Sequence, residues 1–215
     1  MPDNERAATT RRVPKQVRSR DRVARILEVT SQLVVESGVE SLTTRAIAAT
    51  AGIPVASLYQ YFADKEAILV ALVERDVAEM DDQVARDLRA LRMLSVRAIV
   101  ETTMRAFVKV YHRRPAFVMI YLRGRTNPEI RDFCRAHNRR VARELFEFAR
   151  AADMVQSHST GRFAELAVEV GDRLFQLAFE HSLEGDADVI EESIAMVSGY
   201  LETHATPNGI AGITV

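Results

Sequence analysis

Cysteine is scarce in this sequence: of 215 residues, only Cys134 carries a thiol. An internal disulfide framework is therefore excluded, and the composition fits a reducing compartment. No apolar run approaches the roughly 20 residues that a membrane-spanning helix needs. The polar, arginine-rich N-terminus lacks the apolar segment of a secretory signal. We therefore expect a cytoplasmic protein.

The motifs of catalysis are also missing. The histidines do not occur at the spacing with glutamate that builds a helical metal site, and no G-x-S-x-G elbow, phosphate-binding glycine loop or dinucleotide fingerprint is present. Cys134 lies on an apolar helical face, where a small buried thiol is favoured over a redox sensor. We predict that the chain is not an enzyme and that it uses neither a metal nor a cofactor.

Charge is unevenly distributed along the chain. The net charge is −1, but residues 1–25 contain eight Arg or Lys residues and three acidic ones, which gives this end +5 and leaves −6 for the rest. A basic end and an acidic body suit a protein that presents one face to phosphate. Residues 1–19 are expected to be a basic flexible arm, either a solvated tail or an arm that enters the minor groove of DNA.

Strand signals are weak, whereas helical periodicity recurs almost everywhere, so the expected fold is all-α. We predict a small domain over 20–66, a larger helical domain over 67–204 and a flexible tail over 205–215. Thr43, Asp64, Ser95 and Asn127 are expected N-caps. Helices are expected over 20–37, 44–51, from 54 onward, and over 65–91, 96–112, 116–123, 128–150, 160–184 and 187–204.

The most informative segment is LTTRAIAATAGIPVASLYQYFADK, residues 42–65. Gly52 ends one short helix because a residue without Cβ adopts left-handed geometry without steric cost. Pro54 begins a second helix, where its missing N–H is no loss. Leu58 and Phe62 are four residues apart and face back toward the first helix. Two short helices joined so tightly indicate a helix-turn-helix, whose second helix enters the DNA major groove.

Particular residues of this segment resemble the DNA-binding domain of the tetracycline-repressor (TetR) family of bacterial regulators. They are the LTTR run, the IA pair, the AG that ends the first helix, the SLYQYF run and Lys65, within residues 20–66. The resemblance implies a homodimeric transcription factor, most often a repressor, in which a ligand in the large domain moves the fourth helix and releases DNA. Val55 and Ala56 depart from a polar reading surface, so readout there relies on methyl contacts.

Candidate DNA contacts follow from these positions and side chains. The hydroxyl groups of the threonine, serine and tyrosine residues can hydrogen-bond phosphate oxygens. Arg45 reaches a guanine edge, and the Gln60 amide pairs with adenine through two atoms. Lys65, at a helix N-terminus, adds charge to free N–H groups. The expected DNA-binding residues are Thr44, Arg45, Val55, Ala56, Ser57, Tyr59, Gln60, Tyr61 and Lys65.

The last two long helices have apolar faces that are suited to a four-helix dimer interface. Over residues 163–183 the apolar arc is much wider than the about 100° that a surface helix needs. The alternative is that both faces are intrachain core. The expected interface residues are Phe163, Leu166, Val170, Leu174, Leu177, Ile190, Ile194, Val197 and Leu201.

Aromatic residues and a few polar groups share apolar arcs in the middle of the large domain. This composition describes a small-molecule pocket, and it describes an ordinary core nearly as well. Arg123 or His137 is the expected polar anchor for an apolar or aromatic ligand. The expected pocket residues are Thr103, Phe107, Tyr111, Phe117, Tyr121, Arg123, His137, Asn138, Phe175 and Phe179.

These features together predict a dimeric TetR-like regulator, most readily a repressor released from a palindromic operator by a small apolar or aromatic effector. Its partners are then double-stranded operator DNA, a second copy of the chain and an unknown small molecule. Two alternatives stay open. The large domain either only dimerises, in a ligand-independent or partner-regulated DNA-binding protein, or belongs to an all-α small-molecule carrier.

Overall fold

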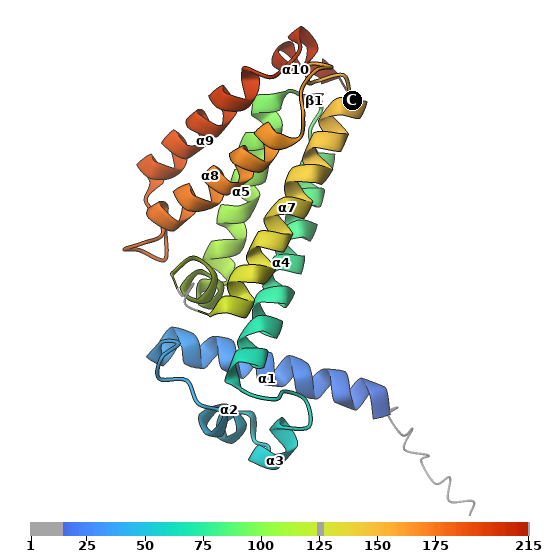
Figure 1. Cartoon of the computed structure of the whole chain (residues 1–215). Coiled ribbons are helices and arrows are strands. Elements are labelled where there is room, and N and C mark those ends of the chain that lie inside the picture. The colour runs from blue at the N-terminus through green and yellow to red at the C-terminus, as the bar shows by residue number, and fades with distance from the viewer. Residues whose placement is uncertain (1–14, 124–126, 215) are drawn as a thin grey trace, which may run out of the picture.

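The computed structural model describes residues 15–123 and 127–214, and these residues are mostly helical with almost no strand, as predicted (Figure 1). Two two-residue strands, β1 (Met93–Leu94) and β2 (Ile213–Thr214), form the sheet. A π-helical turn, η1, spans Val118–Arg123. The helices are α1 (Lys15–Ser37), α2 (Thr44–Ala51), α3 (Val55–Leu58), α4 (Lys65–Arg89), α5 (Val96–Arg113), α6 (Pro115–Phe117), α7 (Pro128–Ala151), α8 (Arg162–Ala178), α9 (Ala187–Glu202) and α10 (Pro207–Ala211).

Local signals fix where the helices begin. The four predicted N-caps are confirmed: the side chains of Thr43, Asp64, Ser95 and Asn127 each accept a hydrogen bond from a backbone N–H in the following turn. Gly52 ends α2 in the left-handed region with φ of 69°, also as predicted. These caps satisfy N–H groups that a helix leaves unbonded at its start.

The helices form two groups that are joined by α4 (Figure 1). α1, α2 and α3 lie at one end, while α5 and α7 pack against the far half of α4, and α8 and α9 pack against α7 and α5 on the side away from α4. α1 also packs against α6, which belongs to the second group. One continuous cluster of buried apolar residues runs through both groups, from Ile26 and Ile47 to Phe117 and Phe175. Cys134 lies in this cluster, which confirms the prediction of a buried thiol.

Two helix boundaries differ from the prediction by five or six residues. Helix α1 begins at Lys15, so residues 15–19 of the expected arm are helical, whereas residues 1–14 lie outside the described residues. Helix α8 ends at Ala178, six residues before the expected end. The chain turns back there because Phe179 is fully buried and the Asp186 N–H donates to the Ala178 carbonyl at 2.8 Å.

The segment 205–215, which we expected to be a flexible tail, contains helix α10 and strand β2 in its described part. Strand β2 pairs antiparallel with β1, with Ile213 opposite Leu94. Thr206 donates its hydroxyl to the Asp153 carbonyl at 2.7 Å and accepts the Gly209 N–H at 3.1 Å. These contacts are backbone-centred, so the sparse apolar residues of the tail gave no periodic signal for them.

Candidate nucleic-acid interface and ligand cavity

The helix-turn-helix is built on a small apolar core. Ile47 and Ala48 of α2 and Leu58 of α3 are fully buried, and Phe62 is nearly so. The Ile53 N–H donates to the Ala48 carbonyl at 3.0 Å, which holds the turn closed. The predicted inward roles of Leu58 and Phe62 are therefore confirmed, and the opposite surface of the pair is left to solvent.

The reading helix is shorter than its sequence predicts. Pro54 is the N-cap of α3 rather than its first residue, and the helix ends at Leu58. The chain continues in turns, with the N–H groups of Tyr61 and Phe62 both donating to the Leu58 carbonyl. This arrangement brings Phe62 into the core and places Tyr59, Gln60 and Tyr61 just beyond the helix.

The predicted DNA contacts differ in exposure. Tyr61 and Val55 are partly buried and pack against the core. The Nζ of Lys65 lies 4.0 Å from the Oε1 of Glu66. The Tyr59 and Thr44 hydroxyl oxygens are 3.1 Å apart on the surface. The exposed members of the set are Arg45, Ala56, Tyr59 and Gln60, and the half-buried ones are Thr44, Val55, Ser57, Tyr61 and Lys65.

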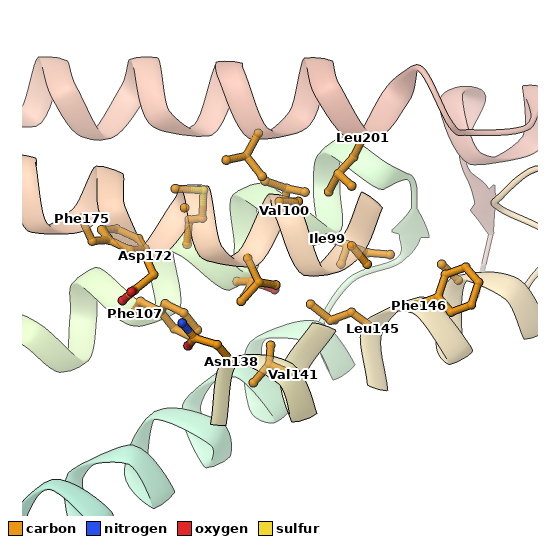
Figure 2. Close-up of a pocket in the computed structure, with 18 of the residues that line it drawn as sticks. Ile99, Val100, Phe107, Asn138, Val141, Leu145, Phe146, Asp172, Phe175 and Leu201 are labelled. Carbon is orange, nitrogen blue, oxygen red and sulfur yellow. The ribbon is translucent and has the colours of Figure 1, made fainter. Parts of the chain in front are cut away.

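A cavity of about 130 Å³, called here the inner cavity, lies among α4, α5, α7, α8, α9 and η1 (Figure 2). Most of its lining is apolar. Figure 2 shows Asp172 and Asn138 at one end with the rings of Phe107 and Phe175. The Tyr111 ring centroid lies 6.5 Å from that of Phe107 and 5.5 Å from that of Phe175. The cavity therefore has an aromatic, partly polar end and an aliphatic remainder.

Seven of the ten predicted pocket residues line the inner cavity: Thr103, Phe107, Tyr111, Tyr121, His137, Asn138 and Phe175. The other three do not. Phe117 and Phe179 are fully buried in the core, and the Arg123 Nε donates to the Phe179 carbonyl at 2.7 Å. Sequence reasoning missed wall residues such as Val100, Met104 and Val168, because a helical arc identifies apolar residues without telling which of them faces a cavity.

His137 connects α7 to α4 at the cavity wall. Arg140 donates to the His137 Nδ1 at 2.9 Å and pairs with Asp81 at 2.7 Å. Burial lowers the pKa of His137, although Asp81 opposes the shift. The imidazole is therefore neutral at pH 7, with Nδ1 as the acceptor. A neutral imidazole adds a hydrogen-bonding group to the wall but no positive charge.

A second, larger hollow of about 660 Å³ runs between α4 and α7 and is called here the α4–α7 groove. Its walls include Val84 and Leu88 of α4 and Leu145 and Phe148 of α7. It lies beside the helix that joins the two groups, so an occupant of the groove touches that helix directly.

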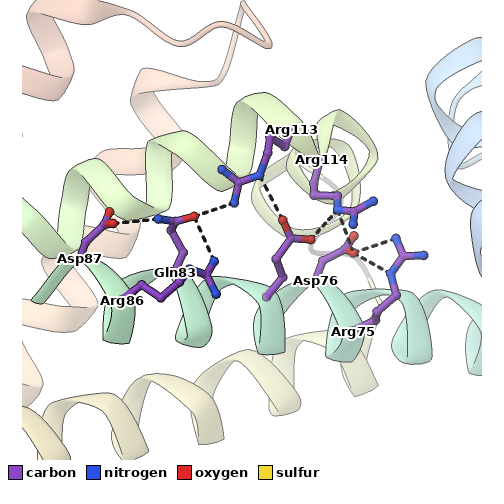
Figure 3. Close-up of polar contacts among 8 residues, drawn as sticks. Arg75, Asp76, Gln83, Arg86, Asp87, Arg113 and Arg114 are labelled. Atoms are coloured by element: carbon purple, nitrogen blue, oxygen red, sulfur yellow. Dashed lines mark hydrogen bonds and ion pairs between the residues drawn. The ribbon is translucent and has the colours of Figure 1, made fainter. Parts of the chain in front are cut away.

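Closer to the start of α4, a polar network joins this helix to α1 and to the end of α5 (Figure 3). Asp76 is fully buried and pairs with Arg75 at 2.8 Å. Burial raises the pKa of Asp76 despite the nearby Arg75 and Arg114. Burial also opposes the downward shift in the pKa of Glu79, but hydrogen bonds from Arg114 and Arg113, at 2.7 Å and 3.1 Å, outweigh it. The network lies where α4 passes from one group to the other.

The predicted dimer residues divide into two sets. Phe163, Ile190, Ile194 and Val197 are buried within the chain, and Phe163, Val197 and Leu201 line the inner cavity. Leu166, Val170 and Leu177 remain exposed on α8, at 50%, 46% and 42%, and Leu174 is half-buried. Met196 and Tyr200 on α9, which the sequence did not indicate, are also exposed. The exposed α8–α9 strip consists of Leu166, Val170, Leu177, Met196 and Tyr200.

Two other kinds of feature are absent within residues 15–123 and 127–214. Histidine, cysteine and acidic side chains form no cluster of three that is suited to a metal ion. None of the helices is long and apolar enough to span a membrane.

A helix-turn-helix joined by one long helix to a larger helical bundle defines a DNA-binding transcriptional regulator. Residues 26–72 match the family model of bacterial regulatory proteins, tetR family, and residues 95–201 match that of the tetracyclin repressor-like C-terminal domain. The chain belongs to the TetR family. The resemblance seen in the sequence is confirmed, and since the family consists of transcriptional regulators, the chain is not an enzyme.

Relatives with this architecture are distant in sequence. The HTH-type transcriptional regulator BetI of Rhizobium meliloti (strain 1021) is 24% identical over 186 residues, which span 86% of this chain and 89% of that protein. A TetR-family regulator from Streptomyces coelicolor has a TM-score of 0.69 at 26% identity, covering 85% of this chain and 99% of its own. A TetR-family structure from Syntrophomonas wolfei has a TM-score of 0.68 at 18% identity, covering 86% and 96%, and supports the fold alone.

Proposed function

We propose that the protein is a cytoplasmic, homodimeric repressor that binds a palindromic operator and is released from it by a small, largely apolar effector. The observation that carries the DNA-binding part is the exposure of Arg45, Tyr59 and Gln60 on a helix-turn-helix whose apolar residues are buried. Arginine and glutamine read base edges, and tyrosine hydroxyls bind phosphate.

Dimerisation uses the α8–α9 strip. Five large apolar side chains of this strip are exposed on two adjacent helices, and such a surface is characteristic of an interaction site. A two-fold axis through this strip pairs the same helices of both copies in a four-helix arrangement. The two reading helices then lie about one DNA turn apart, roughly 34 Å, on a palindromic site.

Effector binding in the inner cavity supplies the regulation. The cavity supports a ligand-released repressor over a large domain that only dimerises, because its wall includes α4 through Met80. An effector shifts the equilibrium only if it binds the DNA-free conformation more tightly than the DNA-bound one. Movement of α4 changes the position of the helix-turn-helix, since α4 begins at Lys65, directly after it.

Selection of duplexes from a random-sequence pool tests this proposal. The purified protein is expected to enrich one motif with two inverted half-sites whose centres are about ten base pairs apart. Enrichment of a single half-site contradicts the dimeric mode, and enrichment of no motif contradicts specific operator binding. The recovered duplex then serves to screen small molecules for loss of binding, and the absence of any effector contradicts only the ligand-released part.

A further inference from the structure

The inner cavity and the α4–α7 groove share part of their lining. Four residues belong to both: Thr103 and Phe107 of α5 and Val141 and Leu145 of α7. These side chains form the junction between a small apolar space of about 130 Å³ and an open one of about 660 Å³. The two hollows therefore lie on either side of a common wall, which these four side chains form.

Thr103 has an unmet hydrogen-bonding group at this junction. The residue is 8% exposed, and its hydroxyl oxygen is buried without a hydrogen-bond partner among the described residues. Helical threonine usually bonds a backbone carbonyl of the preceding turn, and a buried hydroxyl without a partner is destabilising. Rotation about χ1 moves the hydroxyl from one staggered position to another. A ligand atom at the junction supplies the acceptor that the protein does not.

The sizes of the two hollows indicate the shape of the ligand. An apolar cavity of about 150 Å³ holds a benzene molecule, so the inner cavity accommodates one ring or a branched alkyl end. The groove has the volume of an ordinary ligand site, about 300–1,000 Å³. Its Arg140 already pairs with Asp81 at 2.7 Å and Glu144 at 3.5 Å, so a charged ligand group there competes with existing ion pairs.

We propose that the two hollows form one site for an elongated, uncharged ligand with a ring-sized end, a carbonyl or hydroxyl group and a flexible apolar chain. The ring fills the inner cavity, and the ligand oxygen accepts a hydrogen bond from the Thr103 hydroxyl. The apolar chain lies along the groove between α4 and α7. This inference rests on the proposed effector binding and specifies its chemistry. It also explains how a ligand reaches α4, because the chain lies against Val84 and Leu88.

The first test measures binding of alkyl phenyl ketones, from acetophenone to hexanophenone, by isothermal titration calorimetry with the full chain and without DNA. Full burial of a methylene corresponds to about a fourfold gain in affinity. Because the groove is open on one side, we expect about a twofold or larger gain for each added methylene. Affinity that is flat or falls beyond acetophenone overturns the two-hollow site, and so does a failure of every ketone to bind.

A variant in the groove distinguishes the contributions of the two hollows to ligand binding. Phe148 lines the groove but not the inner cavity, and its side chain is 46% exposed, so Phe148→Ala leaves the core intact. The variant is expected to reduce the gain per methylene and to leave acetophenone binding unchanged. Val35→Ala, at an apolar residue of α1 that is 42% exposed and lines neither hollow, is the matched control. A full chain-length gain in Phe148→Ala contradicts the placement of the chain.

The anchor is tested by Thr103→Val, which keeps the side-chain shape and removes the hydroxyl. We expect about a tenfold loss of affinity for hexanophenone and no loss for hexylbenzene, which lacks the oxygen. The unliganded variant is expected to melt at the same or a higher temperature, because a buried unbonded hydroxyl is gone. The control is Thr102→Val, at the neighbouring residue that lines neither hollow. Equal losses for ketone and hydrocarbon overturn the role of Thr103.

Operator binding, measured in parallel, keeps this inference distinct from the proposed function. Ketones that bind with the predicted length and Thr103 dependence but leave DNA affinity unchanged contradict ligand release and support the site. Release of DNA by an effector whose binding is insensitive to Phe148→Ala and Thr103→Val has the opposite meaning: the regulation stands and the two-hollow site is wrong.

Discussion

The phenolic oxygen of Tyr59 lies 3.1 Å from the hydroxyl oxygen of Thr44, although the two residues are 15 positions apart. This contact joins the first residue of α2 to the residue that follows α3. It lies on the exposed surface, and each hydroxyl can form a further hydrogen bond. The two side chains are thus positioned relative to each other before DNA is bound.

Tyr59→Phe tests the importance of that hydroxyl. The variant keeps the ring and loses both the bond to Thr44 and the proposed phosphate contact, so operator affinity is expected to fall about five- to tenfold. Stability is expected to change by less than about 0.5 kcal/mol, because the site is exposed. Fluorescence anisotropy measures the operator affinity, and thermal melting measures the stability. If the operator affinity of Tyr59→Phe is unchanged, the Tyr59 hydroxyl has no role in DNA binding.

Glu79→Gln tests the network between α4 and the end of α5. Arg113 and Arg114 lower the pKa of Glu79 below its usual 4.5 in the folded state. The carboxylate therefore stabilises the fold above that pH, and its contribution is lost as pH falls through the lowered pKa. We expect Glu79→Gln to cost about 1–2 kcal/mol at pH 7 and progressively less below pH 4.5.

Urea unfolding at a series of pH values measures this difference. Glu74→Gln, an exposed substitution on the same helix, serves as the control and is expected to have little effect at any pH. A destabilisation by Glu79→Gln that stays constant down to pH 3 contradicts a role for the ionised carboxylate.

Gly209→Ala tests the packing of the C-terminal segment. A Cβ at residue 209 meets the Met154 backbone carbonyl, so the segment has to shift, and a loss of about 2 kcal/mol or more is expected. Gly52→Ala is the comparison, since a Cβ there meets no atom of the described residues within 4 Å and only the φ of 69° is unfavourable, at a cost of about 1 kcal/mol. Thermal melting ranks the two variants, and a neutral Gly209→Ala indicates that the segment is not packed as described.

Leu166→Glu tests the α8–α9 strip as a dimer interface. Leu166 is 50% exposed in the single chain, so the charge is tolerated there and destabilises only a paired copy. Light scattering after gel filtration is expected to show a monomer, with operator affinity lowered at least a hundredfold. Ile210→Glu, an exposed apolar residue on α10, should leave the dimer intact. If the Leu166→Glu protein is still a dimer, the dimer interface is not the α8–α9 strip.

Structural features that depend on a few neighbouring residues were predictable from the sequence. Features that depend on contacts between distant residues were not. The caps at Asp64 and Ser95 depend on one side chain and the next turn, so residue type and spacing suffice. The inner cavity was predicted in part, because His137 and Asn138 stand out as polar residues within an apolar arc. Periodicity alone did not separate buried Ile194 from exposed Leu166, since both belong to apolar faces and only the neighbouring helix decides which is covered.

The polar network around Asp76 had no local signal. Arg113 and Arg114 precede Pro115 and read only as the end of a helix. Their pairing with Glu79 joins residues more than 30 positions apart, and the burial of Asp76 depends on elements that are equally distant. The same limit applies to Thr103, whose unbonded hydroxyl becomes significant only when the surrounding helices are in place.

The most direct test of the account is the affinity of the protein for the selected duplex and for a scrambled duplex of equal composition, measured across a salt series. We expect the selected duplex to bind about a thousandfold or more tightly, with affinity that falls steeply as salt rises. Replacing Arg45 and Tyr59 together with alanine is expected to reduce binding of the selected duplex to the level of the scrambled one. Equal binding of both duplexes by the unaltered protein, or a double variant that keeps its preference, contradicts the α2–α3 surface as the reader of operator DNA.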